Sequence, residues 1–289
     1  MIRKIAALAL ALILLCACAS AQTGTIAVSF YPIYIFAENV LDGIEGISLV
    51  SLTPPGTGCL HDYQLLTGDM KTLAQADALV INGAGMEDSF LPAIRRQMPE
   101  LPVADLSEGI ELIEENGESN SHIWLSPKNA MKMVENLCAF LCALYPEYAD
   151  QMQQNTQAYL DRLGLLDAEL EEGLSHLAHR DIVTFHEAFP YFAKAYQLNC
   201  VASLTQDADE APSPRELARV IDLISEIHPC PLFAEPGVSS DALQTVAAET
   251  GEQVYVLDPV TEGEYAKTDY EDKMRINLQV LQQALGCEE

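Results

Sequence analysis

The sequence predicts an α/β fold of two lobes joined by one long helix. Short apolar runs rich in β-branched residues alternate with helical patterns along both halves of the chain. We expect strands at residues 25–30, 47–52, 78–82 and 102–106, and again at 181–185, 200–204, 231–234 and 253–257. Because helical patterns separate these runs, each lobe is expected to hold a mostly parallel sheet of about four strands.

Two helix starts share one signal, a serine followed by a proline. Ser126–Pro127 and Ser213–Pro214 each stand just before apolar residues at helical spacing. Serine caps the N-terminus of a helix, and proline fits the first helical position, where no N–H is needed. The signal predicts one such helix in each half and suggests that the two lobes are related.

Residues 146–179 are predicted to form the linking helix. Tyr159, Leu163, Leu166 and Leu170 recur there at helical spacing among many polar residues. A helix of roughly 30 residues is about 45 Å long, and it is stiffer than a hinge of extended strands. We therefore expect an N-terminal lobe at residues 24–145, a C-terminal lobe at residues 180–289, and little domain motion on ligand binding.

The start of the chain has the pattern of an export leader. A basic start precedes an apolar run at residues 5–15, which is too short to span a bilayer. Leucine and a small residue before Cys18 are typical of a bacterial lipobox, so residues 1–18 are interpreted as a lipoprotein signal with Cys18 carrying the lipid. Cys16 fits less well, because Leu15 stands where a small residue is wanted. The alternative is an ordinary cleaved signal and a free soluble protein.

Composition narrows the class of partner. The formal net charge of −28 at pH 7 argues against nucleic acid or an anionic membrane surface as a partner, and it attracts cations. Hydrophobic residues make up 49% of the chain, so large cores are expected and disorder is not. We expect a monomer in the cell envelope, either lipid-anchored at the outer face of the cytoplasmic membrane or in the periplasm. The lipid is expected to be its only contact with the membrane.

Three histidines lie in loops next to predicted strands: His61 and His122 in the first half of the chain, and His186 in the second. Glu235 and Asp258 likewise follow predicted strands. Ligands of open α/β sheets bind beyond the carboxyl ends of the strands, and imidazole is a common ligand of Zn²⁺. The sequence therefore predicts a metal site between the lobes. Structural roles are expected for the remaining histidines, His176, His179 and His228.

The cysteines beyond the leader are Cys59, Cys138, Cys142, Cys200, Cys230 and Cys287. None has the CxxC spacing of a zinc site. Cys138 and Cys142 lie four residues apart on an apolar helical face and are expected in the core. The sequence leaves open whether Cys200 and Cys230 bridge neighbouring strands, and how the others pair. Cys59 stands two residues before His61 and is the cysteine nearest the predicted site.

A set of short motifs covers nearly the whole chain beyond the leader. The motifs are FYPIY at 30–34, PPGT at 54–57, HDY at 61–63, AD at 76–77, NG at 82–83, HIWLSP at 122–127, TFHEAF at 184–189, APSP at 211–214 and FAEP at 233–236. In this order they resemble the zinc- and manganese-binding solute receptors of metal ABC transporters, cluster A-I. HDY alone is weak, but the ordered set is specific.

The resemblance implies a C-clamp of two lobes with one metal in the cleft between them. It implies that His61 and His122 are the ligands from the first lobe and that His186 is the first ligand from the second. For the fourth ligand we expect Asp258. Glu235 is the alternative, or a group that orients a histidine, as such sites usually require.

Two departures from the family pattern matter. Residues 114–121 form a short acidic stretch without histidine, where zinc receptors of the family often carry a long His-rich loop. A metal-collecting loop is therefore not expected. Gly58, Cys59 and Leu60 replace the Glu–Pro often found before the first ligand. In one interpretation Cys59 adds a thiolate ligand to the metal site. The favoured interpretation is that Cys59 is buried or disulfide-bonded.

The donor types favour Zn²⁺ as cargo, with Mn²⁺ second. Three neutral imidazoles and one carboxylate suit tetrahedral Zn²⁺, whereas Mn²⁺ prefers more oxygen ligands. His186 stands where manganese receptors tend to place a carboxylate. The resemblance also implies delivery to a membrane permease, and the sequence contains no P-loop, so the energy is expected from a partner ATPase.

Two other classes of protein compete with the receptor. A zinc hydrolase also uses three histidines with an open position, but the chain has no HExxH motif. Glu187, beside His186, is interpreted as a helix-start carboxylate rather than a general base. A metal-independent adhesin or surface lipoprotein is the third class, for which the sequence offers no repeat. We expect a receptor and no enzyme.

Overall fold

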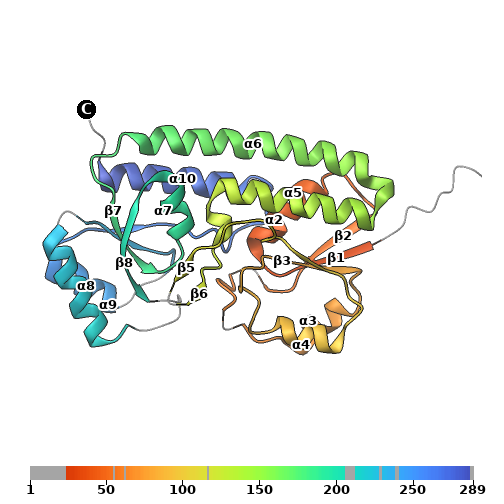
Figure 1. Ribbon diagram of the computed structural model, residues 1–289, viewed down its shortest axis with the longest axis horizontal. Coiled ribbons are helices and arrows are strands. Elements are labelled where there is room, and N and C mark those ends of the chain that lie inside the picture. Colours follow the sequence, from red (N-terminus) through yellow and green to blue (C-terminus); the bar gives the residue numbers. More distant parts are fainter. Residues whose placement is uncertain are drawn as a thin grey trace, which may run out of the picture.

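The computed structural model describes residues 24–54, 56–61, 63–115, 117–205, 212–227, 230–237 and 241–286. Figure 1 shows two lobes side by side, with one long helix, α6 (Ala149–Ser175), running across both of them. The predicted leader with Cys18, His228 and Cys287 lie outside the described residues. No helix in the described ranges is both long enough and apolar enough to span a bilayer.

The first lobe is built on a parallel sheet whose strands follow apolar runs. The strands are β1 (Gly24–Val28), β2 (Ile47–Ser51), β3 (Ala78–Ile81) and β4 (Val103–Asp105). They lie in the order β2-β1-β3-β4, and every pair is parallel. Each strand falls within one or two residues of its predicted position, because a run of buried apolar residues is a strong local signal.

The second lobe repeats this topology. Its strands are β7 (Asp181–His186), β8 (Asn199–Thr205), β9 (Leu232–Ala234) and β10 (Val254–Val256), in the order β10-β9-β7-β8, all parallel. In both lobes the first and third strands lie side by side at the centre. The chain turns in opposite directions from this central pair, and ligands bind at such a switch point. The prediction of an α/β fold with two four-stranded, parallel sheets is confirmed.

Helices pack against both sheets. They are α2 (Tyr31–Val40), α3 (Thr67–Leu73), α4 (Leu91–Gln97), α5 (Pro127–Leu144), α6 (Ala149–Ser175), α7 (Pro190–Tyr196), α8 (Pro214–Ile227), α9 (Asp241–Thr250) and α10 (Asp269–Leu285). The α5 N-terminus is capped by Ser126, whose Oγ accepts from Asn129 N at 3.5 Å. At α8, Ser213 Oγ accepts from Glu216 N at 3.3 Å. Both predicted helix starts are therefore confirmed.

The linking helix α6 has 27 residues, which is about 40 Å. It begins three residues later than predicted, because Pro146–Tyr148 forms a 3₁₀ turn first. Its predicted apolar stripe is fully buried, and that stripe is Tyr159, Leu163, Leu166 and Leu170. The stripe belongs to the larger of two hydrophobic cores, which runs through the first lobe and the long helices. A smaller core fills the space between the second sheet and helices α8 and α9.

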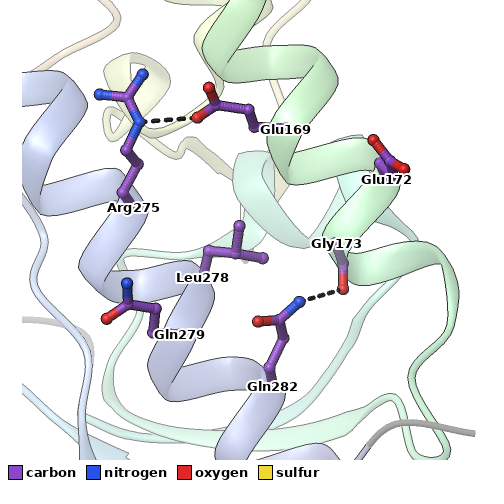
Figure 2. Close-up of a pocket in the computed structure, with 7 residues that line it drawn as sticks. All are labelled: Glu169, Glu172, Gly173, Arg275, Leu278, Gln279 and Gln282. Atoms are coloured by element: carbon purple, nitrogen blue, oxygen red, sulfur yellow. Dashed lines mark hydrogen bonds and ion pairs between the residues drawn. The ribbon is translucent and has the colours of Figure 1, made fainter.

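Helix α10 packs against the second half of α6 and runs in the same direction, which stiffens the link between the lobes (Figure 1). Figure 2 shows Arg275 Nε bound to Glu169 Oε2 at 2.7 Å and Gln282 Nε2 donating to the carbonyl of Gly173 at 2.9 Å. A Cβ on Gly173 would lie 2.8 Å from Leu278 Cδ1, so glycine permits this close approach of the helices.

The C-terminal part of the chain also packs against the first lobe. Trp124 Nε1 donates to the carbonyl of Pro259 at 2.8 Å, and the Tyr270 hydroxyl donates to the carbonyl of Trp124 at 2.7 Å. On the same side, Arg162 binds Glu271 at 2.9 Å and also contacts Asn39 in α2. The loop at Pro259 and helix α10 therefore hold the lobes together in addition to α6.

The cysteines of the second lobe are not positioned to bridge adjacent strands. Cys200 lies on β8 and Cys230 precedes β9, and β7 runs between those two strands. Both residues are thiols. In α5, Cys138 and Cys142 are also thiols, with sulfur atoms 3.7 Å apart in the apolar face of the helix. Their predicted place in or against the core is confirmed.

Candidate metal site

His122 is held by a short hairpin that the sequence patterns did not predict. Strands β5 (Glu114–Glu115) and β6 (Glu118–Ser119) pair antiparallel and lie between the lobes in Figure 1. The chain then enters the 3₁₀ turn η1 (Ile123–Leu125), so that His122 stands buried at its start, 2% exposed. The carbonyl of Ser121 accepts from Asn82 Nδ2 at 2.9 Å, which ties this turn to the end of β3.

His186 is the last residue of β7 and is 1% exposed. Its Nδ1 contacts Glu235 Oε1, and Glu235 directly follows β9. The histidine and the carboxylate therefore stand at the ends of the two central strands of the second sheet. This is the position at which a ligand site is expected in such a sheet.

The two histidines meet between the lobes. The Nε2 atoms of His122 and His186 lie 3.0 Å apart, and their ring centroids are 4.8 Å apart. Cys59 Sγ lies 3.4 Å from His122 Nε2 and 3.9 Å from His186 Nε2. In the described part of the chain, these three residues form a group whose ligand atoms all lie within 4.8 Å of one another.

Hydrogen-bond partners fix which nitrogen of each ring faces the group. Asn120 Oδ1 lies 3.2 Å from His122 Nδ1, and Glu235 Oε1 contacts His186 Nδ1. Both partners are acceptors, so each Nδ1 carries the proton and donates it. Each Nε2 is then left with a lone pair directed toward the other ring. Such orientation of ligand histidines by an acceptor on the far nitrogen is usual in metal sites.

Burial favours the neutral form of the His122 ring. The pKa of His122 is well below its usual value because the ring is buried, and because His186 and His61 lie nearby. Neutral imidazole is the form that binds a metal ion. The site is therefore prepared for a cation without first having to lose a proton from His122.

His61 lies at the edge of the group rather than within it. Its Nε2 is 3.3 Å from Ser121 Oγ, and its ring centroid is 5.3 Å from that of His122. The loop that carries it also carries Cys59, which is a half-buried thiol. This differs from the expectation that Cys59 is buried or disulfide-bonded. The position of Cys59, two residues before His61, did not distinguish a ligand from a structural cysteine, because this spacing is not common in metal sites.

Asp258 follows β10, as predicted, but its carboxylate has other partners. Its Oδ2 accepts from Lys273 Nζ at 2.5 Å, and its Oδ1 accepts from the backbone of Val260 at 2.7 Å. Asn277 binds the backbone of Asp258 through both atoms of its amide. The structure thus places Asp258 in an ion pair with α10 and not with the three grouped side chains.

The buried carboxylate of Glu87 holds the backbone at the end of β3, beside the residues that position His122. Glu87 is 1% exposed and accepts from the backbone amides of Asn82 at 2.9 Å and Gly83 at 3.0 Å. Burial raises the pKa of Glu87 to about 7. Through Asn82 this network reaches the carbonyl of Ser121, next to His122. In the sequence this network was marked only by the Asn82–Gly83 motif at the end of an apolar run, and not by Glu87.

One protein-family model matches residues 26–284 of the chain. That model is described as the zinc-uptake complex component A, periplasmic (ZnuA). The chain belongs to this family. The ZnuA family is one of metal-binding solute receptors of ABC transporters, so the family resemblance of the motifs is confirmed.

Curated relatives of this ZnuA-family chain are named as binding proteins for different metals. It is 29% identical over 284 residues to the zinc-binding lipoprotein AdcA of Streptococcus pneumoniae, covering 91% of this chain and 56% of that protein. It is 31% identical over 238 residues to the iron-binding protein YfeA of Yersinia pestis, covering 79% of this chain and 74% of YfeA. The chain thus spans about half the length of its AdcA relatives.

Solved structures share the fold. The substrate-binding protein FpvC of Pseudomonas aeruginosa with Ni²⁺ matches with a TM-score of 0.83 at 26% identity, covering 93% of this chain and 100% of that one. A crystal structure of ZnuA matches with a TM-score of 0.80 at 28% identity, covering 91% and 100%. The metal of the ZnuA-family chain does not follow from these names, because they span zinc, iron and nickel.

Proposed function

We propose that this chain is an extracytoplasmic receptor that binds one divalent transition-metal cation, Zn²⁺ in preference to Mn²⁺, between its lobes. It then delivers the cation to an ABC permease, whose ATPase powers uptake. The observation that supports metal binding is the meeting of the His122 and His186 Nε2 atoms at 3.0 Å. Two lone pairs at this distance repel each other unless a cation, either a proton or a metal ion, lies between them.

The proposed ligands begin with this pair. His61 is the third imidazole, on the loop beside the site, where its ring centroid lies 5.3 Å from that of His122. Glu235 orients His186 through Nδ1 and is not itself a ligand, because it contacts the nitrogen that faces away from the group. Asp258 binds the metal only if its carboxylate leaves Lys273.

The donor atoms support zinc as the cargo. Imidazole nitrogens suit Zn²⁺, whereas Mn²⁺ is bound best by sites rich in carboxylate and carbonyl oxygen. The three side chains that converge here offer two nitrogens and one sulfur, and among the described residues no carboxylate oxygen belongs to the group. Any such site binds Zn²⁺ more tightly than Mn²⁺ in solution, so the cargo in the cell must be tested there.

Delivery to a permease is proposed from the family, and the anchor from the leader. The lipid on Cys18 would keep the receptor at the membrane that holds its permease. Lobes that are held together by α6, α10 and the Trp124 contacts have little freedom to close as rigid bodies. Release of the cation is therefore expected to involve the 59–61 loop or the His122 turn rather than a large hinge motion.

A competitive titration of the demetallated protein with Zn²⁺ and Mn²⁺ tests the binding step. We expect one site that prefers Zn²⁺, and a loss of Zn²⁺ affinity of at least about a hundredfold in His122→Ala and in His186→Ala. His179→Ala is the matched control, because His179 is exposed at the far end of α6. Unchanged affinity in both site variants would remove the proposed site.

An uptake experiment tests the delivery step. The gene for the chain is deleted in the cells that carry it. The cells are grown with a zinc chelator, and their zinc accumulation is measured. We expect accumulation to fall and to recover with the wild-type chain but not with His122→Ala. Normal accumulation in the deleted cells with no other zinc receptor active would contradict delivery.

A further inference from the structure

We propose that Cys59 is a metal ligand, so that the site combines a thiolate with imidazoles and selects thiophilic cations of the Zn²⁺ and Cd²⁺ class against Mn²⁺. This inference rests on the proposed metal-receptor function and names its fourth donor. It replaces the carboxylate of Asp258 that the sequence favoured.

The distances fit a shared cation. Bonds of about 2.0–2.1 Å to nitrogen and about 2.3 Å to sulfur place tetrahedral ligands roughly 3.3 Å apart for N and N, and roughly 3.6 Å apart for N and S. The His122 and His186 nitrogens are 3.0 Å apart, and Cys59 Sγ lies 3.4 and 3.9 Å from them. All three separations lie within about 0.4 Å of those expected for one zinc ion.

The loop is built to hold Cys59 in this position. Leu60 is fully buried, its N–H points at Met86 Sδ at 3.4 Å, and its carbonyl accepts from Ser89 Oγ at 3.3 Å. Gly58, on the other side of Cys59, has φ +76°, a conformation that L-residues with side chains rarely adopt. The turn at Gly58 and the anchor at Leu60 fix the backbone on both sides of the thiol.

Among the residues that the structure describes, the two carboxylates predicted near the site from the second lobe have other partners. The Asp258 carboxylate accepts from Lys273, and Glu235 faces Nδ1 of His186, on the side of the ring opposite Nε2. The sulfur therefore occupies the position next to both Nε2 atoms that a carboxylate would need. Its binding breaks the S–H bond, forms a sulfur–metal bond and releases one proton to solvent. Soft thiolate favours Zn²⁺ and Cd²⁺ over the harder Mn²⁺.

Spectroscopy of the protein loaded with Cd²⁺ or Co²⁺ tests the inference. We expect a thiolate-to-metal charge-transfer band in the wild type that disappears in Cys59→Ser and remains in Cys142→Ser, a thiol far from the site. Zn²⁺ affinity is expected to fall by about tenfold or more in Cys59→Ser, with a much smaller change for Mn²⁺, so that the preference for Zn²⁺ narrows.

Alkylation provides a readout that needs no variant. Zn²⁺ is expected to protect Cys59 from a thiol reagent and to leave Cys142 unprotected, as read by peptide mass spectrometry. Stoichiometric Zn²⁺ binding with no charge-transfer band and no protection of Cys59 would overturn this inference and leave the receptor function standing. Absence of any metal binding by the wild type would overturn both.

Discussion

The Nε2 atoms of His122 and His186 lie 3.0 Å apart, although 64 positions separate the residues in the chain. One ring comes from the turn after the β5–β6 hairpin, and the other from the end of β7. Contacts beside the site hold this approach in place. Asn120 Nδ2 donates to the carbonyl of Glu187 at 2.9 Å, and the Tyr191 hydroxyl donates to the carbonyl of Asn120 at 2.8 Å. These contacts join the two sides of the site across the lobes.

Replacing Asn120 with alanine should weaken metal binding without removing a ligand. Asn120 Oδ1 accepts from the backbone of His122 and lies 3.2 Å from its Nδ1, so its loss frees the ring to rotate or change tautomer. We expect Zn²⁺ affinity to fall by about 10–100-fold, measured by competition with a chelating dye. Asn199→Ala is the control, since that amide binds Asp181 on the surface. Equal affinities in the two variants would contradict the orienting role.

Removing the Tyr270 hydroxyl should loosen the contact between α10 and the first lobe. The hydroxyl is buried and donates to the carbonyl of Trp124, so Tyr270→Phe leaves that carbonyl without its partner. We expect the free energy of unfolding in urea to fall by about 1–3 kcal/mol. Tyr255→Phe removes a hydroxyl that binds Gln253 at an exposed position, and it should cost less than about 0.5 kcal/mol. Similar costs in both variants would show that the Trp124 contact contributes little.

The buried Glu87 should make stability depend on pH. Its pKa is raised to about 7 by burial, above the value of 4.5 for a free glutamate. The folded protein therefore holds the proton more tightly than the unfolded chain, and this contribution is complete below pH 4.5 and lost as the pH rises through about 7. The unfolding free energy of the wild type, measured relative to that of Glu87→Gln, should fall by on the order of 3 kcal/mol as the pH rises across that range. Urea titrations of the metal-free proteins measure it, and a constant difference would refute the role of Glu87.

Alanine at Gly83 should be far more damaging than alanine at an open glycine. Gly83 has φ +80°, and a Cβ there would lie 1.8 Å from Asp105 Oδ1. Gly251 has φ +76° with nothing within 4 Å, so Gly251→Ala measures the backbone cost alone, roughly 1–2 kcal/mol. We expect Gly83→Ala to lose about 1–3 kcal/mol more. Thermal unfolding measures the loss of stability in both variants. Equal losses would mean that the side chain of Asp105 moves aside at little cost.

Much of the fold was predictable because its signals are local. Apolar runs marked the strands of both sheets, and the Ser–Pro pairs marked α5 and α8. The β5–β6 hairpin was missed because its strands are short and polar, and its pairing depends on the turn. The return of the C-terminal segment to Trp124 was missed because no periodicity encodes contact between distant segments.

The site was predictable in part. Histidines next to strand ends indicated His122 and His186, since the carboxyl ends of parallel strands gather at one edge of a sheet. The ion pair of Asp258 with Lys273 and the approach of Cys59 depend on how α10 and the 59–61 loop pack. Whether His61 and Asp258 bind the metal stays a prediction.

The central claim is that a single cation sits between the lobes on His122 and His186. Anomalous diffraction at the zinc absorption edge from crystals of the zinc-loaded protein tests it most directly. We expect one strong peak at about 2.0–2.1 Å from both Nε2 atoms. A fully occupied zinc site elsewhere, with no peak between these two rings, would contradict it.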